Sequence, residues 1–269
     1  MYLHLISVGT SILRNFVSFE KEDFVKKYKM KDWYMLDPED EKQRKIEALA
    51  YRGNEVFEKL LNYVNSMPKE ASAELNAFYR FIDFKMQNPS KIEIYLYSTD
   101  TGTSWLCTNI IYHHLNERGF KVQQPIKLKG IGKGILHFEE GLIEIIDKVV
   151  GIIKEKKAQG FRIFVNATAG FKPESTFIVM AASLAFADQV YYIHESFKET
   201  VTIPLLPVII DPNYIEILKM LKNPMPKYLV KEYLMYRGIE LAELEERGLI
   251  KEEEGVIELR EWVKKLIEF

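Results

Sequence analysis

Val165-Asn166-Ala167-Thr168-Ala169-Gly170-Phe171-Lys172-Pro173-Glu174 carries three signals within ten residues: the end of a strand, a small polar turn and the start of a helix. The residues leading into it, Phe161–Val165, form a short apolar and β-branched run that is typical of a buried strand. Pro173 and Glu174 suit the first turn of a helix. The turn between strand and helix offers backbone N–H groups, hydroxyls and the cation Lys172 at a helix N-terminus, which suits a phosphate. An ordinary strand-to-helix connection without a ligand is the alternative.

Apolar runs of the same kind recur on both sides of this stretch, and helical patterns separate most of them. They occupy residues 2–8, 92–97, 121–128, 189–194 and 200–205. Alternating strands and helices predict a parallel sheet covered on both faces, whereas the short turn before the last run makes the final two strands antiparallel. We therefore predict an α/β fold over residues 1–207: a Rossmann-like, doubly wound, mostly parallel sheet with antiparallel edge strands.

A long helical region interrupts this alternation between the first two strands, at about residues 20–88. Within it Leu75, Phe78, Ile82 and Met86 recur at helical spacing, which predicts the buried face of a helix. We expect this insertion to cover a face of the sheet or a partner subunit.

The last part of the chain, residues 213–269, follows another pattern. Three short helices, a hairpin and a final helix are typical of a small winged helix-turn-helix domain. Such a domain reads DNA with its third helix and needs cations there. Here the third helix, residues 240–247, is rich in glutamate, and Glu252–Glu254 form the tip of the hairpin. This negative charge disfavours DNA binding and favours contact with a protein or dimerisation.

Composition excludes several classes of protein. The chain has 269 residues, a net charge of −2 and a single cysteine, Cys107. Near-neutral charge gives no sign of a nucleic-acid surface, and one cysteine excludes an internal disulfide framework or a multi-thiolate metal site. Neither a signal segment nor an apolar run of about 18 residues occurs. We expect a soluble, cytoplasmic protein with no membrane contact, and we interpret Cys107 as a small buried residue.

Small and polar residues gather after four of the predicted parallel strands, in loops 9–15, 98–105, 129–134 and 166–172. In a doubly wound sheet these loops meet at the carboxyl edge, where ligands bind. They favour a phosphate-bearing nucleotide, although the dinucleotide and Walker-type glycine motifs are both missing. Asp100 is the only carboxylate in these loops, and none of the five histidines has metal-ligand spacing. We therefore predict no metal and no cofactor, and we interpret the histidines as structural or surface residues.

Five motifs at these positions together resemble the CRISPR-associated Rossmann-fold (CARF) domain, in particular the ring nucleases of archaea with type III CRISPR systems. They are Ser7-Val8-Gly9-Thr10-Ser11, Ser98-Thr99-Asp100-Thr101, Phe138-Glu139-Glu140-Gly141-Leu142, Asn166-Ala167-Thr168-Ala169-Gly170-Phe171-Lys172 and Val190-Tyr191-Tyr192-Ile193. The resemblance covers residues 1–207, and the run from Asn166 to Lys172 is its most specific part. Ala169 stands where glycine is common in the family.

This resemblance implies a homodimer, formed through the CARF domain, whose two clefts bind one ring of cyclic tetra-adenylate. It implies that Ser11 and Lys172 are catalytic and that no metal takes part. The ribose 2′-hydroxyl attacks the adjacent phosphorus and expels the 5′-oxygen, leaving 2′,3′-cyclic phosphate ends. The ligand-binding residues suggested by the loops and the resemblance are Gly9, Thr10, Arg14, Asn15, Thr99, Asp100, Thr101, Ser104, Trp105, Gly130, Gly132, Lys133, Asn166, Thr168, Ala169, Gly170 and Phe171.

Two functions remain open at this point. The first is a ring nuclease that degrades the cyclic nucleotide and so switches off type III CRISPR signalling. The second is a sensor that holds the ring intact and passes the change to the C-terminal domain as a transcription regulator. The acidic third helix of that domain weighs against the second. No histidine in the loops can act as a base, so we expect slow cleavage that depends on positioning and electrostatics.

Overall fold

The computed structural model describes residues 1–20, 22–130, 135–168, 172–194 and 199–267. The strands of its central sheet are β1 (Tyr2–Val8), β2 (Ile92–Thr99), β3 (Lys121–Val122), β4 (Ile126–Leu128), β5 (Arg162–Asn166), β6 (Gln189–His194) and β7 (Glu199–Ile203). Their order is β3-β2-β1-β5-β6-β7, with β4 beside β2 further along the same edge as β3. The described pairs are parallel except β6 with β7. The predicted mostly parallel α/β sheet with an antiparallel edge is confirmed.

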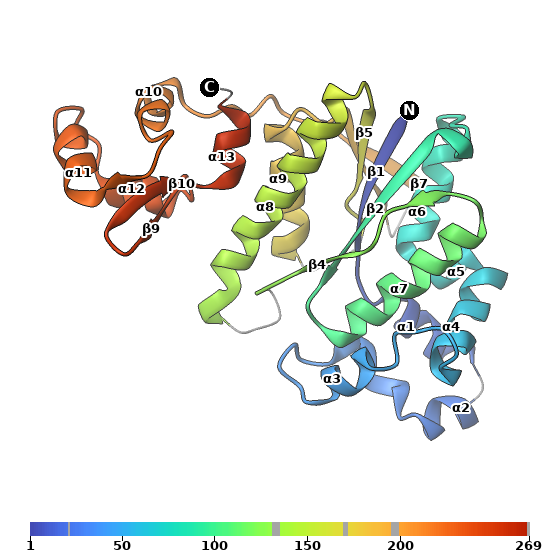
Figure 1. The fold of residues 1–269 in the computed structure, drawn as a ribbon. Helices are drawn as coiled ribbons and strands as arrows, with labels where there is room; N and C mark the ends of the chain where they lie inside the picture. Colours follow the sequence, from blue (N-terminus) through green and yellow to red (C-terminus); the bar gives the residue numbers. More distant parts are fainter. Residues whose placement is uncertain (21, 131–134, 169–171, 195–198, 268–269) are drawn as a thin grey trace.

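The helices of this part of the chain are α1 (Ser11–Phe19), α2 (Glu22–Lys27), η1 (Met30–Met35), α3 (Lys42–Glu47), α4 (Glu55–Ser66), α5 (Pro68–Ala71), α6 (Ala73–Phe84), η2 (Pro89–Lys91), α7 (Gly102–Glu117), α8 (Ile135–Ala158) and α9 (Lys172–Leu184). Four of them form the two layers on the sheet, with α8 and α9 on one face and α6 and α7 on the other (Figure 1). A hydrophobic core lies on each face of the sheet, and strand β2 contributes to both. Leu96 packs with α7 in one core, and Tyr97 packs with α8 in the other. Successive side chains of a strand point to opposite faces, so a strand of a sheet that is buried on both sides needs apolar residues at successive positions.

The insertion between β1 and β2 covers part of the sheet, as predicted. Helix α6 lies against β6 and β7, opposite the face that α9 covers. The ring of Phe81 on α6 stacks on that of Tyr191 on β6, with centroids 3.9 Å apart. Helices α1, α2 and α3 gather beyond the carboxyl ends of the strands, at the bottom of Figure 1. The insertion therefore shapes the sheet edge at which a ligand is expected.

The predicted buried face of the last insertion helix is confirmed for Leu75, Phe78 and Ile82 and wrong for Met86. Helix α6 ends at Phe84, and Met86 has a φ of 48°, in the left-handed region. Its side chain is 90% exposed. The chain reverses here because the backbone N–H of the residue after Met86 bonds back to the carbonyl of Ile82 at 2.9 Å. Helical spacing alone does not reveal where a helix ends.

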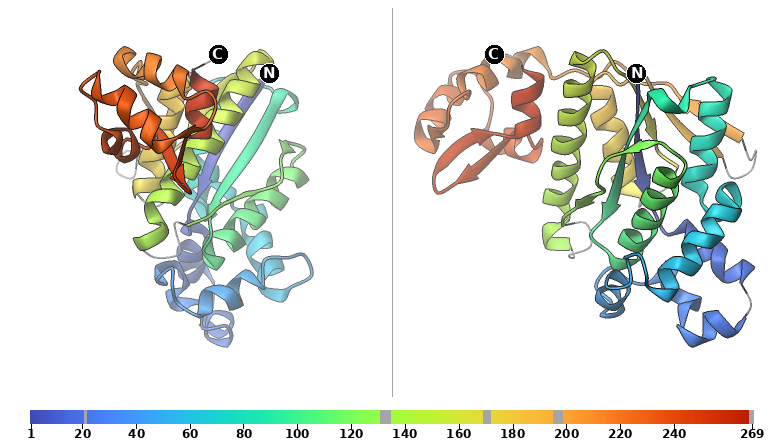
Figure 2. Two further views of the ribbon diagram at one scale, coloured as in Figure 1. Left: turned by 60° about the vertical axis from the view of Figure 1, so that its left-hand side comes forward. Right: turned by 45° about the vertical axis from the view of Figure 1, so that its right-hand side comes forward.

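The C-terminal elements are α10 (Pro212–Met220), β8 (Met225–Pro226), α11 (Lys227–Met235), α12 (Leu241–Glu246), β9 (Ile250–Glu253), β10 (Val256–Leu259) and α13 (Glu261–Leu266). The helices and the hairpin occur in the predicted order, and β8 adds a short third strand beside β10. These elements lie on the far side of α8 from the sheet (Figure 2). Among the helices of the described residues, none combines the length and the apolar composition of a membrane-spanning segment.

Candidate functional site

The site lies where the chain leaves β1 and β5, two parallel neighbours at the centre of the sheet. Strand β2 follows β1 on one side, whereas β6 follows β5 on the other, so the connections diverge at this point. Ligands of doubly wound sheets bind in the crevice beyond such a reversal. Ile6 pairs with Asn166, the last residue of β5. The turn that carries Ser11 and the turn that leads to Lys172 therefore leave the sheet side by side.

Ser11 begins α1 and is held by a residue of the insertion. Its Oγ atom donates a hydrogen bond to Oε2 of Glu74 at 2.6 Å and accepts one from the backbone N–H of Ala73 at 3.2 Å. Glu74 is 1% exposed. Its Oε1 atom accepts the backbone N–H of Gly9 at 2.8 Å, and its Oε2 atom also accepts the Ser72 hydroxyl at 2.7 Å. A buried carboxylate thus closes the inner side of the first turn and fixes the serine.

The end of β5 is tied to the same glutamate. The amide of Asn166 donates to the backbone carbonyl of Glu74 at 3.0 Å and accepts the N–H of Thr168 at 3.1 Å. The Thr168 hydroxyl in turn accepts the N–H of Ile193 on β6 at 3.1 Å. Asn166 is fully buried, so its amide shapes the turn from within. Ala169, Gly170, Phe171 and the side chain of Lys172 lie outside the described residues.

The loop after β2 is organised by its hydroxyls. Thr101 caps α7, and its Oγ1 atom lies 2.9 Å from that of Thr99. Ser104 is buried, where it donates to the carbonyl of Val8 at 2.8 Å and accepts the Ser98 hydroxyl at 3.0 Å. This serine therefore joins the ends of β1 and β2.

Helix α3 of the insertion covers the start of α7. The Gln43 side chain accepts the N–H of Thr103 at 3.0 Å. The backbones approach so closely that a Cβ atom on Gly102 would lie 1.8 Å from the carbonyl oxygen of Gln43. Only glycine fits at this position, and the first turn of α7 faces the insertion.

The loops after β2 and β4 are joined directly. Asp100 accepts the N–H of Gly130 at 3.0 Å. Nearby, the ammonium group of Lys127 lies 4.5 Å from the ring centroid of the half-buried Trp105 and 2.6 Å from Glu47. One face of the Trp105 ring is therefore covered by a cation. Gly132 and Lys133, which the sequence also assigns to ligand binding, lie outside the described residues.

The remaining candidates on α1 differ in exposure. Arg14 is exposed. Thr10 donates its hydroxyl to the carbonyl of Tyr34 at 3.3 Å, and Asn15 donates to two carbonyls at the end of α5, at 3.0 and 3.1 Å. Thr10, which precedes α1, and Asn15, within it, therefore attach the insertion to this helix, and Arg14 is the side chain of this group that reaches solvent.

Glu74 is the residue of this site that reasoning from the sequence missed. It lies three positions before Ala77 and seven before Phe81, and all three are buried on one side of α6. A glutamate within an apolar stripe of a helix is unusual, because an ionised side chain is rarely buried without partners. The glutamate within this apolar stripe could have indicated that Glu74 has a special role. Its contact with Ser11 could not have been predicted, because local spacing does not show which distant residues meet.

The buried histidines His4 and His114 lie away from this edge and have structural hydrogen-bond partners. His4 lies between the Tyr191 hydroxyl, at 3.0 Å, and the Gln87 side chain, at 2.8 Å, and burial lowers its pKa to about 4. Burial, with a smaller effect of a nearby arginine, lowers the pKa of His114 to about 4. Burial raises the pKa of the Cys107 thiol. These observations agree with the structural interpretation of both histidines and of the cysteine.

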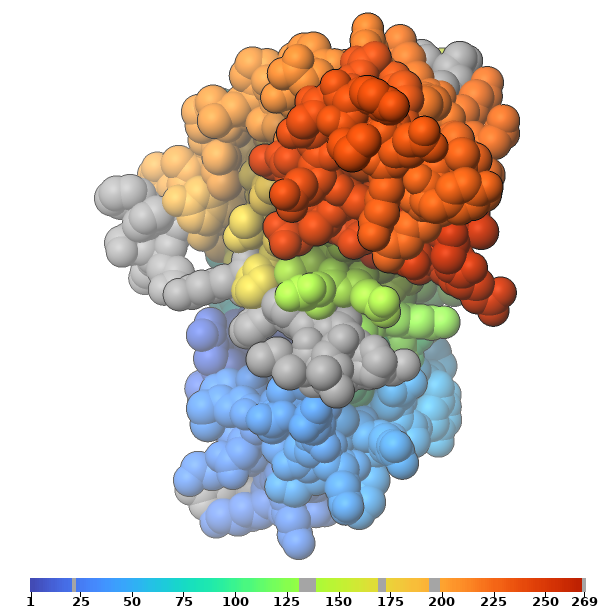
Figure 3. Space-filling view, turned by 90° about the vertical axis from the view of Figure 1, so that its left-hand side faces the viewer, coloured from blue at the N-terminus to red at the C-terminus, as the bar shows by residue number. Residues whose placement is uncertain are grey.

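Two widely separated parts of the chain share one exposed side of the molecule. Figure 3 shows the first insertion helices at the bottom, the C-terminal elements at the top and the first described turns of α8 between them. The start of α8 therefore lies between the carboxyl edge of the sheet and the C-terminal elements.

A comparison with protein families identifies the chain. A family model described as CRISPR-associated protein (Cas_APE2256) matches residues 69–206, just over half of the sequence. The matched part contains Glu74, the loop after β2 and the turn after β5, and it ends directly after β7. The chain therefore belongs to this family of CRISPR-associated proteins.

Proposed function

We propose that this protein is a ring nuclease that binds cyclic tetra-adenylate as a homodimer and cleaves it without a metal ion. Membership of a CRISPR-associated family supports a role in CRISPR signalling. The observation that carries the proposal is the junction of the two turns, because Glu74 bonds to Ser11 through its carboxylate and to Asn166 through its carbonyl. The serine and the turn that leads to Lys172 are thereby held at one crevice, the usual ligand site of this fold.

In this reaction the protein has two roles, which are to orient the reacting groups and to stabilise the negative charge that develops. The 2′-oxygen of one ribose forms a bond to the adjacent phosphorus as the bond from phosphorus to the 5′-oxygen breaks. The 2′-hydroxyl loses its proton, and the leaving oxygen gains one. Ser11 would orient the attacking hydroxyl, and Lys172 would balance the negative charge that grows on the phosphoryl oxygens. A ring with repeated units suits two symmetry-related clefts, which supports the homodimer.

The test uses the purified full chain and labelled cyclic tetra-adenylate in the presence of EDTA. We expect linear products with 2′,3′-cyclic phosphate ends. Ser11→Ala and Lys172→Ala should keep much of the binding and lose cleavage. Ser18→Ala is a matched control, because Ser18 is an exposed residue of the same helix whose hydroxyl donates to the carbonyl of Arg14 at 3.3 Å. Parent-like cleavage by both site variants would overturn the assignment of these residues.

A non-cleaving sensor is the second candidate, and one contact favours it. Trp262 of α13 donates its backbone N–H to Asp147 of α8, at 2.6 Å. Helix α8 follows the loop at residues 129–134, so a ligand at the sheet edge could act on the C-terminal elements through this helix. We propose that these elements form a winged-helix domain that contacts a protein, with DNA as the alternative. An intact ring after prolonged incubation, with ligand-dependent binding of a DNA duplex, would support the sensor.

A further inference from the structure

The Ser11 hydroxyl has little hydrogen-bonding capacity left. A serine hydroxyl offers one proton and two acceptor lone pairs. Its proton is directed to Oε2 of Glu74 at 2.6 Å, a length typical of a hydroxyl bound to a carboxylate. One lone pair accepts the N–H of Ala73 at 3.2 Å. Among the described residues no further group bonds to this oxygen, so within this part of the structure one lone pair of the half-buried Ser11 remains for a ligand.

The surroundings of Glu74 keep its carboxylate as the acceptor, and Ser11 as the donor, in the hydrogen bond between them. The carboxylate is buried, and each described group bonded to it is a donor: the backbone N–H of Gly9 and the hydroxyls of Ser11 and Ser72. The Ser72 hydroxyl also caps α6 by accepting the N–H of Leu75 at 3.2 Å. Glu74 is the acceptor at the centre of these bonds, and the Ser11 proton therefore has a buried partner at 2.6 Å.

We infer that Glu74 is a positioning residue that fixes Ser11 as a hydrogen-bond acceptor towards the ligand. This inference rests on the proposed ring nuclease function. An acceptor-only serine accepts a hydrogen bond from the ribose 2′-hydroxyl and leaves a lone pair of the 2′-oxygen free to face phosphorus. The same polarity selects the ligand, because a sugar with only an acceptor at the 2′ position has nothing to donate to Ser11. The site therefore requires a donor at that position.

Glu74→Gln tests the inference with little change in shape. The glutamine can place its amide N–H towards Ser11, so that the serine proton turns outwards and the polarity reverses. Ser72→Ala is the matched control, because it removes another hydroxyl from the same carboxylate oxygen and also the cap of α6, while it leaves the bond to Ser11. The unfolding temperature of each variant reports any general loss of stability.

Three quantities decide the outcome: kcat, KM, and the ratio of affinities for the ring and for its 2′-fluoro analogue. We expect the parent and Ser72→Ala to prefer the hydroxyl-bearing ring by ~5-fold, the effect of one hydrogen bond. Glu74→Gln should lose or reverse this preference, and its kcat should fall ~10- to 100-fold with KM little changed. If Glu74→Gln does not fold, the preference of the parent is still informative, and equal affinity for the two rings overturns the inference.

The two proposals fail in different ways. A parent protein that neither binds nor cleaves the ring refutes the proposed function, and the role of Glu74 falls with it. A parent that cleaves the ring, together with a Glu74→Gln variant that has the kcat and preference of Ser72→Ala, refutes the role of Glu74 alone.

Discussion

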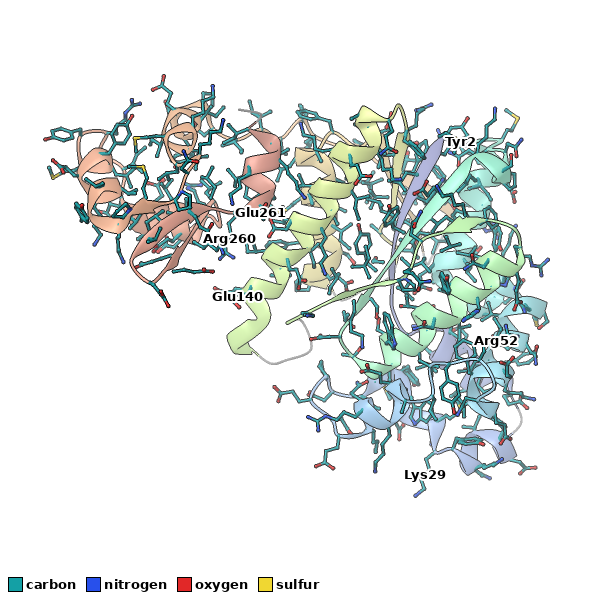
Figure 4. All side chains as sticks on the ribbon, viewed as in Figure 1. Tyr2, Lys29, Arg52, Glu140, Arg260 and Glu261 are labelled. Atoms are coloured by element: carbon teal, nitrogen blue, oxygen red, sulfur yellow. The ribbon has the colours of Figure 1, made fainter. Side chains whose placement is uncertain are left out.

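Asp147 of α8 accepts the backbone N–H of Trp262 at 2.6 Å and so caps a helix to which it does not belong. Arg260, at the N-cap of α13, makes no capping bond with its own side chain. Figure 4 labels Arg260 and Glu261 at the start of α13, beside α8. Burial raises the pKa of Asp147, although the Trp262 N–H opposes this effect. The carboxylate of Asp147 therefore connects helix α8, which packs on the sheet, to the C-terminal elements.

Replacing Asp147 should loosen this connection. We expect Asp147→Ala to lower the free energy of unfolding by about 1 kcal/mol, the usual effect of losing a helix cap. Limited proteolysis should then cut the segment between β7 and α10 faster than in the parent. Glu140→Ala, at an exposed position of the same helix, is the control. Equal effects of the two substitutions would contradict a specific role for the cap.

Acid should destabilise the protein through His4. Burial lowers the pKa of this histidine to about 4 in the folded state, while the unfolded chain has the ordinary value of 6.5. Between these values the unfolded state binds a proton that the folded state does not. Stability should therefore fall as the pH drops from about 6.5 towards 4, by up to about 1.4 kcal/mol per pH unit for this residue.

Urea unfolding at several pH values measures this dependence on His4. His4→Phe should be less stable than the parent at pH 7, because the bonds to Gln87 and Tyr191 are lost. Its stability should also change less between pH 6.5 and pH 4. His114 contributes in the same direction in both proteins, since its pKa is also about 4. Parallel pH curves for parent and variant would contradict the prediction.

Two lysines form ion pairs with the buried carboxylate of Glu93, and replacing each in turn compares a buried with an exposed ion pair. Lys156 and Lys121 each lie 2.7 Å from it, but their side chains are 9% and 62% exposed. Burial of Glu93 opposes its ionisation, yet bonds from the two lysines and Gln123 hold its pKa below the ordinary value. We expect Lys156→Met to cost about 2 kcal/mol and Lys121→Met less than about 1 kcal/mol. Chemical denaturation at pH 7 measures both, and the opposite order would refute the argument.

Trp105 and Phe171 are the two aromatic residues of the predicted loops that could stack on an adenine, and of these Trp105 lies within the described residues. If it does, Trp105→Ala should weaken binding of cyclic tetra-adenylate about 10-fold, as the loss of one base stack does elsewhere. Trp33→Phe is the control, because Trp33 is buried within the insertion. Titration calorimetry of both variants gives the comparison. Unchanged affinity of Trp105→Ala would mean that its ring packs against Lys127 without contacting the ligand.

Much of the architecture can be predicted from local sequence patterns. Apolar runs and helical spacing identify β1, β2, β5 and the helices between them, since each pattern depends on residues only a few positions apart. The short turn between β6 and β7 is enough to require an antiparallel edge. The strand β8 could not be foreseen, because its two residues, one of them a proline, have meaning only beside β10.

The alternation of strands and helices, and the polar residues that follow the parallel strands, can be predicted from the sequence because periodicity and turn chemistry are local properties. The contact between Glu74 and Ser11 and the capping of α13 by Asp147 become visible only in the folded molecule. Ser11 and Glu74 are 63 positions apart in the sequence, and Asp147 is 115 positions from Trp262, whose N–H it accepts. Their contact depends on how α6 docks on the sheet and how the C-terminal elements pack on α8. Such long-range choices follow from packing of whole elements, which no short window of sequence contains.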